Sequence, residues 1–322
     1  MNDSRKKKNK EEFRILSLDG GGIRGIIEAQ VLQNFETEIK TPLYSFFDLI
    51  AGTSTGGILT CLIGGKKLSA NACVEIYDHK NALKMMNGSF WDRILPIENE
   101  PKYDGVGKRE ALNEFLGDKR ILDVGDAAKI LVTAYDLITR KIVTFKSYGG
   151  SDSTYNPTLA EVADASSAAP IYFPTLKSSD DPPRWLVDGG IAANNPGMCA
   201  ITEALKMGHH INSIKMLSLG TGFASRNHDS EAIGEESKHW GAFGWIKNGL
   251  MEHLFAGNSS AVENYCKQAL GDNFLRINGP LVYASSKMDD VDADNIDNLR
   301  RTGKEWYLNA RDDLMELFEL RT

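Results

Sequence analysis

Apolar positions at the start of the chain follow two successive spacings. Phe13 to Leu18 is a nearly continuous apolar run, which predicts a buried strand. The run ends at Asp19-Gly20-Gly21-Gly22. Beyond it, apolar residues recur every four positions, the spacing of one helix face: Ile23, Ile27, Val31, Phe35 and Ile39. The pattern therefore predicts a strand, a glycine turn and a helix in succession.

A second strand, turn and helix follow directly. Phe47 to Ala51 predicts a short strand, Gly52 to Gly57 a tight turn, and Ile58 to Ile63 an apolar helix. Later segments predict strands at 130–135, 142–145, 185–187 and 215–219, and helices at 159–168 and from Pro196. Strands that alternate with helices indicate an α/β fold with a mainly parallel sheet. Because ligands bind at the carboxyl ends of such strands, we expect the glycine turns there to converge on one crevice.

The chain divides into a short tail and one long folded region. Residues 1–12 predict a flexible, solvated tail that is also compatible with contact to anionic lipid, and its basic cluster is Arg5, Lys6, Lys7, Lys8 and Lys10. Residues 13–322 predict one domain, whose last part, 240–322, is expected to be mostly helical. One face of the final helix is marked by Trp306, Ala310, Leu314 and Leu317.

Composition and charge narrow the class of protein. The chain has 322 residues, is 42% hydrophobic and carries a net charge of −7, so DNA or RNA binding is not expected as its main function. Its cysteines have no Cys-x-x-Cys spacing and no histidine cluster, which argues against a disulfide framework or a metal site. Neither a signal-peptide core nor an apolar stretch of roughly 20 residues is found. We therefore expect a cytoplasmic protein that meets a membrane from its surface.

The sequence Gly52-Thr53-Ser54-Thr55-Gly56 is a G-x-S-x-G motif between the second predicted strand and its helix. In such a nucleophile elbow the serine stands on a sharp turn that projects its hydroxyl into a cleft, and flanking glycines leave room for the strained backbone. The free amides of the following helix favour negative charge that develops there. Ser54 is therefore the predicted nucleophile.

The glycine run after the first strand is a second motif, made of Gly20, Gly21, Gly22, Ile23, Arg24 and Gly25. Consecutive glycines let backbone amides face outward as donors to an anion. In an acyl-transfer enzyme that anion is the tetrahedral oxyanion, so we predict an oxyanion hole here. Arg24 is expected either to brace the loop or to face an acidic headgroup. A plain glycine turn and a phosphate cradle are the alternatives.

A serine nucleophile needs a base, and the third motif, Asp188-Gly189-Gly190, places a carboxylate at a strand end. The histidines stand at no evident strand end: they are His79, His209, His210, His228, His239 and His253. We therefore predict a Ser54–Asp188 dyad. Because a free aspartate has a pKa of about 3.9, it has to act at close range in a partly dry site.

Taken in order, these motifs resemble those of the patatin-like phospholipases. The resemblance covers residues 13–222 and includes Lys102-Tyr103-Asp104-Gly105, Ser166 to Pro174, Asp188 to Pro196, and Ser218-Leu219-Gly220-Thr221-Gly222. It implies a three-layer α/β/α fold with a mainly parallel central sheet. It also implies hydrolysis of phospholipid acyl esters by Ser54 and Asp188, with Gly20 to Gly25 as the oxyanion loop. No metal or other cofactor is implied for the chemistry.

Within this family the chain resembles the compact bacterial branch, which includes the phospholipase effectors of cyclic-oligonucleotide antiphage defence (CBASS). That resemblance implies an antiviral enzyme that is activated by a cyclic di- or trinucleotide and acts peripherally on the inner face of the membrane. The alternative is a constitutive housekeeping or secreted lipase, and the sequence is compatible with an oligomer. Weaker alternatives are a kinase-type enzyme, in which Asp19 and Asp188 hold a metal–nucleotide, and a silent lipid-binding protein.

An aromatic-rich stretch follows these motifs and contains Trp240, Phe243, Trp245, Leu250 and Phe255. It is compatible with a wall of the acyl channel or with contact to a bilayer interface. An ordinary packed helix explains the same residues and is the simplest interpretation.

Overall fold

The computed structural model describes residues 12–86, 100–125, 127–149, 155–225 and 230–320. The basic cluster of the predicted tail and His228 lie outside these residues. Among the helices in these ranges, none has the length and apolar character needed to cross a membrane.

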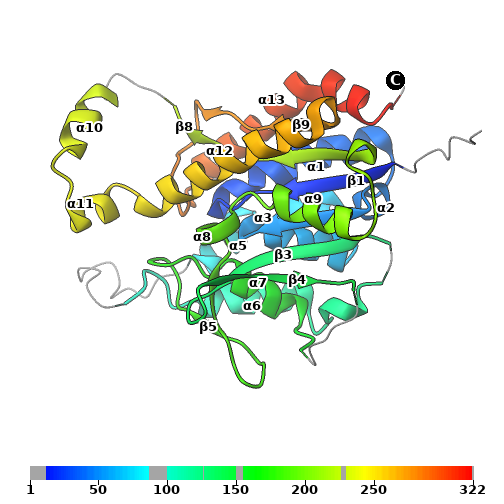
Figure 1. The fold of residues 1–322 in the computed structure, drawn as a ribbon. Coiled ribbons are helices and arrows are strands. Elements are labelled where there is room, and N and C mark those ends of the chain that lie inside the picture. The colour runs from blue at the N-terminus through cyan, green and yellow to red at the C-terminus, as the bar shows by residue number, and fades with distance from the viewer. Residues whose placement is uncertain (1–11, 87–99, 126, 150–154, 226–229, 321–322) are drawn as a thin grey trace, which may run out of the picture.

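A sheet of eight strands forms the centre of the molecule (Figure 1), in the order β5-β6-β3-β2-β1-β7-β9, with β4 also paired to β3. Its strands are β1 (Phe13–Leu18), β2 (Leu49–Thr53), β3 (Lys129–Asp136), β4 (Lys141–Lys146), β5 (Leu176–Lys177), β6 (Trp185–Asp188), β7 (Ile214–Leu219) and β9 (Phe274–Ile277). The neighbours β3, β2, β1, β7 and β9 pair in parallel, whereas β4, β5 and β6 pair in antiparallel register. The prediction of a mainly parallel sheet is confirmed. A separate parallel pair joins β8 (Phe223–Ala224) to β10 (Pro280–Leu281).

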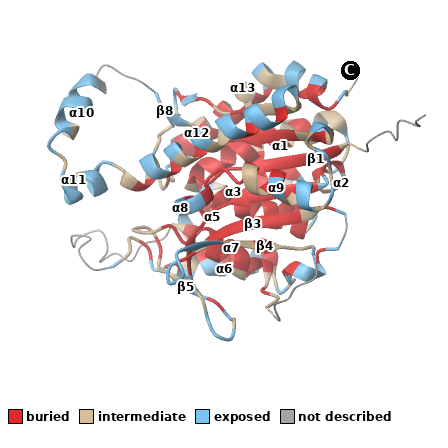
Figure 2. Cartoon of the chain, in the orientation of Figure 1, coloured by how far each residue is buried: buried red, intermediate tan, exposed pale blue. Residues whose placement is uncertain are grey.

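Helices cover both faces of the sheet and complete three layers. They are α1 (Gly25–Ile39), α2 (Leu43–Phe46), α3 (Thr55–Thr60), α4 (Ala70–Ile76), α5 (His79–Met85), α6 (Val106–Leu116), α7 (Leu159–Ser166), α8 (Gly190–Ala193), α9 (Gly197–Lys206), α10 (Ser230–Ser237), α11 (Ala242–Lys247), α12 (Leu250–Leu270) and α13 (Ala293–Leu317). One core contains residues of α1, α3, α7 and α13, and the opposite core contains residues of α9 and α12. Figure 2 shows the buried sheet between the exposed outer sides of these helices.

The side chains of β1 show why both faces are covered. Phe13 and Ile15 belong to the core under α9 and α12, whereas Leu16 and Leu18 belong to the core under α1 and α13. All four are at most 4% exposed. Burying each such side chain contributes about 1.5–3 kcal/mol, so a strand that is apolar on both sides is stable only between two layers.

The local structure differs from the sequence-based expectations in two details. The turn predicted over Gly52 to Gly57 is confined to Ser54, because α3 already begins at Thr55 and contains the glycines that follow. The region 240–322 is mostly helical, as predicted, but it also supplies the strand β9, which pairs with β7 at the edge of the sheet. A four-residue strand with a charged residue in it, Arg276, gives too weak an alternation to detect.

The direction of β6 is a third difference, and it decides where Asp188 lies relative to Ser54. The sequence predicted that the turn after this strand converges with the others at the carboxyl ends of parallel strands. Instead β6 runs antiparallel to β3, with Asp188 opposite Ala134. β2 ends with Thr53 opposite Thr133, and β4 occupies the other edge of β3 along both stretches. β2 and β6 therefore meet end to end along one edge of β3, and this brings Asp188 to the level of the turn after β2.

Candidate active site

Ser54 stands at the turn between β2 and α3 with φ 55° and ψ −122°, an unusual backbone for a residue with a side chain. The glycines on either side are needed because the chain approaches itself closely here. A Cβ on Gly52 would lie 2.1 Å from the Gly56 oxygen, and one on Gly56 would lie 2.3 Å from the Leu18 oxygen. The backbone at Ser54 thus has the strained geometry of a nucleophile elbow.

Neighbouring elements hold this elbow in place. The Ser54 N–H donates to Ser166 Oγ, at the end of α7, over 2.8 Å. On one side of the nucleophile, Thr53 Oγ1 donates to the Ala193 carbonyl at 2.6 Å. On the other side, the Thr55 hydroxyl is hydrogen-bonded to a buried tyrosine hydroxyl at 2.5 Å. The two threonines of the motif therefore support the turn and leave Ser54 as its outward hydroxyl.

Asp188 is fully buried at the end of β6, and its backbone and one carboxylate oxygen are fixed. Its N–H donates to the Ala168 carbonyl at 3.0 Å, and Oδ1 accepts the Gly190 N–H at 2.7 Å. Its second oxygen, Oδ2, has no hydrogen-bond partner among the described residues. A buried carboxylate oxygen without a partner is costly, and such atoms are characteristic of functional sites.

Burial raises the pKa of Asp188 to about 6, although three groups oppose the rise: the Gly190 N–H, the Ser54 hydroxyl and the charge of Lys108. The Ser54 hydroxyl is therefore close enough to act on the carboxylate, while the contact falls outside normal hydrogen-bond geometry. Catalytic hydrogen bonds are often long or poorly aligned before substrate binds. The structure thus brings the predicted nucleophile and the predicted base together.

The glycine loop after β1 lies beside this pair, and most of its amides are already bonded. The Gly20 N–H donates to the Asn194 carbonyl at 3.0 Å, and the Ile23 N–H donates to the Met288 carbonyl at 2.8 Å. Among the described residues, no acceptor is found for the two amides of Gly21–Gly22. Of the predicted donors Gly20 to Gly25, these two are the ones free to receive an anion.

Arg24 braces the loop, which is one of its two predicted roles. Its Nε donates to the Gly21 carbonyl at 3.2 Å, and Nη1 donates to the Gly222 carbonyl at 3.1 Å. The residue is buried, and this burial lowers the pKa of Arg24 to about 10. These two bonds tie the glycine loop to the turn after β7.

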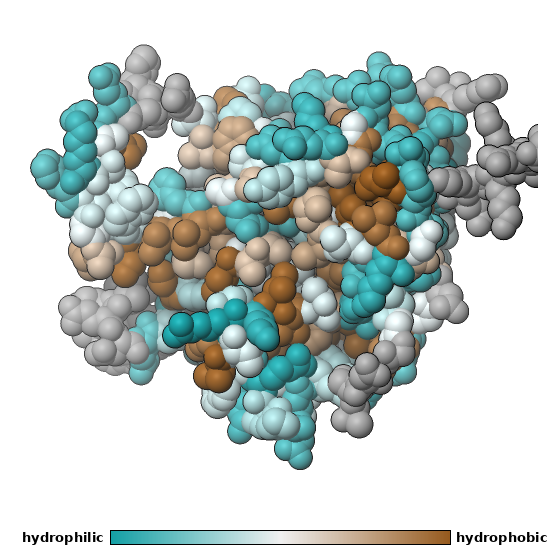
Figure 3. All heavy atoms as spheres, viewed as in Figure 1, coloured by the Kyte–Doolittle hydropathy of each residue, from teal (hydrophilic) through white to brown (hydrophobic). Residues whose placement is uncertain are grey.

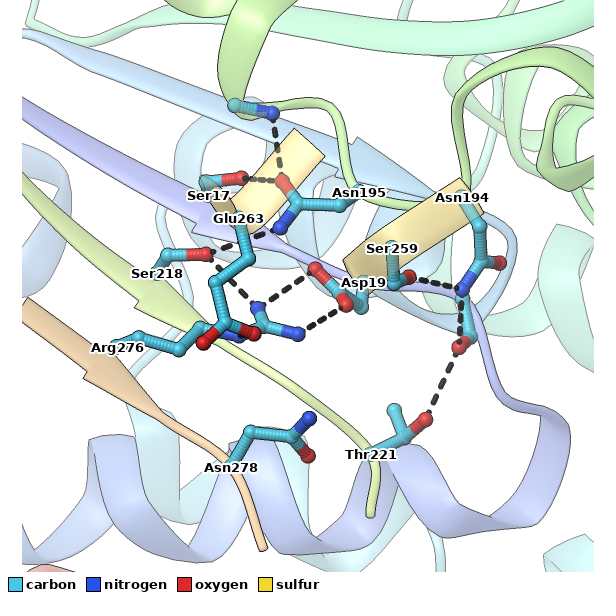
Figure 4. Close-up of polar contacts among 12 residues, drawn as sticks. Ser17, Asp19, Asn194, Asn195, Ser218, Thr221, Ser259, Glu263, Arg276 and Asn278 are labelled. Atoms are coloured by element: carbon cyan, nitrogen blue, oxygen red, sulfur yellow. Dashed lines mark hydrogen bonds and ion pairs between the residues drawn. The ribbon is translucent and has the colours of Figure 1, made fainter. Parts of the chain in front are cut away.

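A polar network beneath the loop joins the ends of β1, β7 and β9 (Figure 4). Arg276 contacts both oxygens of Asp19, at 2.9 and 2.6 Å, and also donates to Ser218 Oγ at 2.8 Å. Burial lowers the pKa of Arg276, but the Asp19 carboxylate outweighs it and the pKa is raised overall. Because Arg276 occupies both Asp19 oxygens, the structure does not support the alternative in which Asp19 holds a metal–nucleotide.

The carbonyl of Gly20 is fixed from two sides. Asn194 Nδ2 donates to it at 3.2 Å and to Ser259 Oγ at 2.9 Å, and Thr221 Oγ1 donates to it at 3.0 Å. The loop is thus held by residues from α12 and from the turns after α8 and β7. Because the loop is held in place, its amide donors do not have to reorient when negative charge develops during a reaction.

A cavity that opens to solvent lies in front of the serine and the aspartate. Its wall is mainly apolar and includes Ile58, Met85, Met86, Phe173, Phe255 and Met288. No histidine is found among the described residues that line it. Of the aromatic-rich stretch, Phe255 on α12 lines the cavity, in agreement with the acyl-channel interpretation. The cavity is therefore suited to an apolar chain whose reacting end lies at Ser54.

Sequence reasoning missed three buried charged residues near the site: Glu28, Lys108 and Arg276. Lys108 stands beside exposed charged residues of α6, so its spacing alone gives no reason to select it. The sequence contains a weak signal that Glu28 is buried, because this residue lies near the start of α1 among apolar residues. Its Oε1 accepts the Asp19 N–H at 2.8 Å, and burial raises the pKa of Glu28 well above its usual value.

Comparison with known proteins agrees with the motifs. The family model for patatin-like phospholipases matches residues 16–201. Patatin-like protein 4 of Arabidopsis thaliana is 31% identical over an alignment that covers 90% of this chain and 82% of that protein, and Patatin-T5 of Solanum tuberosum is 29% identical over 92% and 83%. The crystal structure of VipD from Legionella pneumophila is similar with a TM-score of 0.44 and 14% identity, over 92% of this chain and 67% of that one.

Proposed function

The chain belongs to the patatin-like phospholipase family, and from this premise we propose that it is a serine-dependent lipid acyl hydrolase with Ser54 as nucleophile and Asp188 as base. One observation carries the proposal: a serine at positive φ lies beside a buried carboxylate whose pKa is raised to about 6. Such an aspartate is a stronger base than a free one and is still mostly ionised at pH 7.

The proposed reaction is a two-step acyl transfer. Asp188 takes the hydroxyl proton of Ser54 as Oγ attacks the ester carbonyl, and the resulting tetrahedral intermediate expels the alcohol, which receives that proton. Water then attacks the acyl-enzyme and gives a proton to Asp188. Collapse of the second intermediate returns this proton to Ser54 and releases the carboxylic acid. Each proton has a place in this scheme, so it needs no metal or cofactor.

The free amides of Gly21–Gly22 are the proposed donors to the oxyanion in both intermediates. Gly22 has φ 61°, and a Cβ there would lie 2.1 Å from the Met288 carbonyl oxygen, so the loop keeps its shape only with glycine. Removing one such donor typically raises the barrier by about 2.7–4 kcal/mol. The oxyanion loop would thus contribute much of the rate enhancement, because general-base catalysis by an aspartate alone accelerates the reaction only modestly.

Phospholipid esters are the proposed substrates, reached by peripheral contact with a membrane. The apolar cavity suits an acyl chain, and helix α11 exposes apolar side chains, with Phe243 79% and Ile246 47% exposed. α11 packs on α12, whose Phe255 lines the cavity. Figure 3 shows apolar surface where these two helices meet. This arrangement supports contact between α11 and the lipid surface.

Action on the inner face of the membrane after activation by a cyclic di- or trinucleotide is the finer part of the proposal. It rests on the resemblance to bacterial antiphage effectors, and we assign no residue to a nucleotide pocket. The antiviral role depends on this activation.

Fatty-acid release from phospholipid vesicles tests the function directly. We expect release and fluorophosphonate labelling with the wild-type protein, and loss of both in Ser54→Ala. Ser45→Ala, at an exposed serine on α2, is the matched control and should behave as wild type. Unchanged release in Ser54→Ala would refute the proposed nucleophile.

The same assay with a panel of cyclic di- and trinucleotides tests the regulation. Release that depends on a nucleotide supports the defence effector. Equal release with and without every nucleotide supports a constitutive lipase instead.

A further inference from the structure

Lys108 on α6 is almost completely buried, with 4% of it exposed. Its ammonium group contacts Asp164 Oδ1 at 2.9 Å, the Ser167 carbonyl at 3.0 Å and the Ser167 hydroxyl at 3.2 Å. It also lies 4.2 Å from the centre of the Phe173 ring. Taking an ammonium group out of water costs several kcal/mol, so a lysine is retained in such a place only where its contacts offset that cost.

The segment that Lys108 holds contacts both members of the proposed dyad. Ser166 Oγ accepts the N–H of the nucleophile at 2.8 Å, and the Ala168 carbonyl accepts the N–H of the base at 3.0 Å. Residues 166–168 therefore form a bridge between the elbow and the end of β6. Lys108 fixes the middle of this bridge through the carbonyl and the hydroxyl of Ser167.

Lys108 also acts on Asp188 through its charge. Both residues line the same cavity, and the charge of Lys108 lowers the pKa of Asp188 against the larger effect of burial. Among the described residues that line this cavity, one further carboxylate is found, that of Asp289, and it contacts Lys102. Asp164 of α7 contacts Lys108 itself.

We propose that Lys108 is a positioning residue of the Ser54–Asp188 pair. It holds residues 166–168 against both members, and it supplies the positive charge that keeps the base ionised near neutral pH. This inference rests on the proposed function, since it assumes that Asp188 is the base. It adds a role for α6, a helix that carries neither member of the dyad.

A pair of variants separates the charge of Lys108 from its contacts. Lys108→Met and Asp164→Asn both break the same ion pair, but the first removes a positive charge and the second a negative one. We expect the acidic limb of the pH profile of kcat/KM to move up by about 1 pH unit in Lys108→Met. In Asp164→Asn the limb should stay in place or move down, although both variants lose activity.

An equal upward shift of the acidic limb in both variants would show that Lys108 acts only through its contacts with residues 166–168. It would overturn the proposed electrostatic role of Lys108. A limb that stays at its wild-type position in Lys108→Met would overturn it as well. If Lys108→Met does not fold, the double variant Lys108→Met/Asp164→Leu replaces the pair with apolar side chains, an exchange that buried ion pairs often tolerate. Its limb should lie at a higher pH than that of Asp164→Asn, and limbs at the same pH in these two folded variants refute the proposal.

Ser54→Ala, measured in parallel, tells a failure of this inference from a failure of the proposed function. If ester hydrolysis by the wild type disappears in Ser54→Ala but the limb does not move in the Lys108 variants, the dyad stands and the role of Lys108 is refuted. If hydrolysis persists in Ser54→Ala, the proposed function itself is refuted, and the role of Lys108 with it.

Discussion

The Asp19 carboxylate and the Arg276 guanidinium form a two-point ion pair, although 257 positions separate them in the chain. Asp19 ends β1 and begins the glycine loop, whereas Arg276 lies on β9 at the edge of the sheet. Both side chains are at most 7% exposed. The pair therefore fixes the starting point of the proposed oxyanion loop from below, across β7.

Arg276→Met should destabilise the protein by about 3–5 kcal/mol, because it leaves the Asp19 carboxylate buried without its partner. Denaturant unfolding measures this loss. The double variant Asp19→Asn/Arg276→Met removes both charges and should recover much of the stability. A double variant no more stable than the single one would show that the ion pair is not what holds this end of the sheet.

Gly56→Ala should destabilise the protein by about 1–3 kcal/mol and abolish hydrolysis, because its Cβ would lie 2.3 Å from the backbone oxygen of Leu18. The matched control is Gly257→Ala on α12, where a Cβ would meet nothing within 4 Å. That change should stabilise the helix by about 0.5–1 kcal/mol and leave hydrolysis intact. Thermal unfolding measures the change in stability, and fatty-acid release from vesicles measures hydrolysis. An active Gly56→Ala enzyme would show that the elbow is not as tightly packed as the structure indicates.

Asp188→Asn should lower kcat by about 10²–10⁴-fold, since the variant keeps the shape of the side chain but removes the base. It should also be more stable at pH 7, by up to about 3 kcal/mol, because the wild type keeps an ionised carboxylate in a site that raises its pKa to about 6. Activity assays and denaturant unfolding measure the two effects. Turnover near the wild-type level would mean that another base operates.

The pH dependence of wild-type hydrolysis should show an acidic limb near pH 6, where Asp188 becomes protonated. In the folded protein this carboxyl holds its proton more tightly than in the unfolded chain. Its contribution to stability is therefore complete below pH 3.8 and is lost as the pH rises through about 6. Profiles of kcat/KM check the limb, and full activity at pH 4.5 would exclude Asp188 as the base.

Glu28→Gln should leave hydrolysis unchanged and stabilise the protein increasingly as the pH rises. Burial raises the pKa of Glu28, so the stability of its protonated form is complete below pH 4.5 and is lost as the pH rises through the higher value in the folded state. Glutamine keeps the oxygen that accepts the Asp19 N–H. The gap in melting temperature between the variant and the wild type, measured across pH, gives this effect. Glu236→Gln, at an exposed glutamate, is the control. A gap that does not vary with pH would mean that Glu28 does not titrate differently on folding.

Much of the local structure could be predicted because it depends on neighbours in the chain. The apolar run Phe13 to Leu18 is β1 as predicted, and the four-residue spacing that begins at Ile23 marks a short 3₁₀ turn and then α1. The final helix also carries the predicted apolar face, since Leu314 and Leu317 are buried. Periodicity reports which side of an element faces the core, and this information is present in the sequence itself.

The predicted site residues were also found through local patterns, since a serine between glycines at a strand end implies a strained turn whatever lies around it. The sequence did not show which partners the turn would meet. The sequence places Asp188 at the end of a strand and predicts that this strand is parallel to its neighbours, whereas β6 runs antiparallel to β3. Strand direction depends on pairing with β3, which no pattern within four residues can specify.

Six strands of the central sheet, the glycine turns and the serine between Gly52 and Gly56 can be predicted from the chain alone, because they follow from spacing and from the conformations that glycine permits. The folded protein places β2 and β6 end to end along β3, which sets Ser54 beside Asp188. It also buries Lys108 and Arg276. Burial and proximity depend on contacts between distant segments, so the pKa of Asp188 is a property of the folded protein alone.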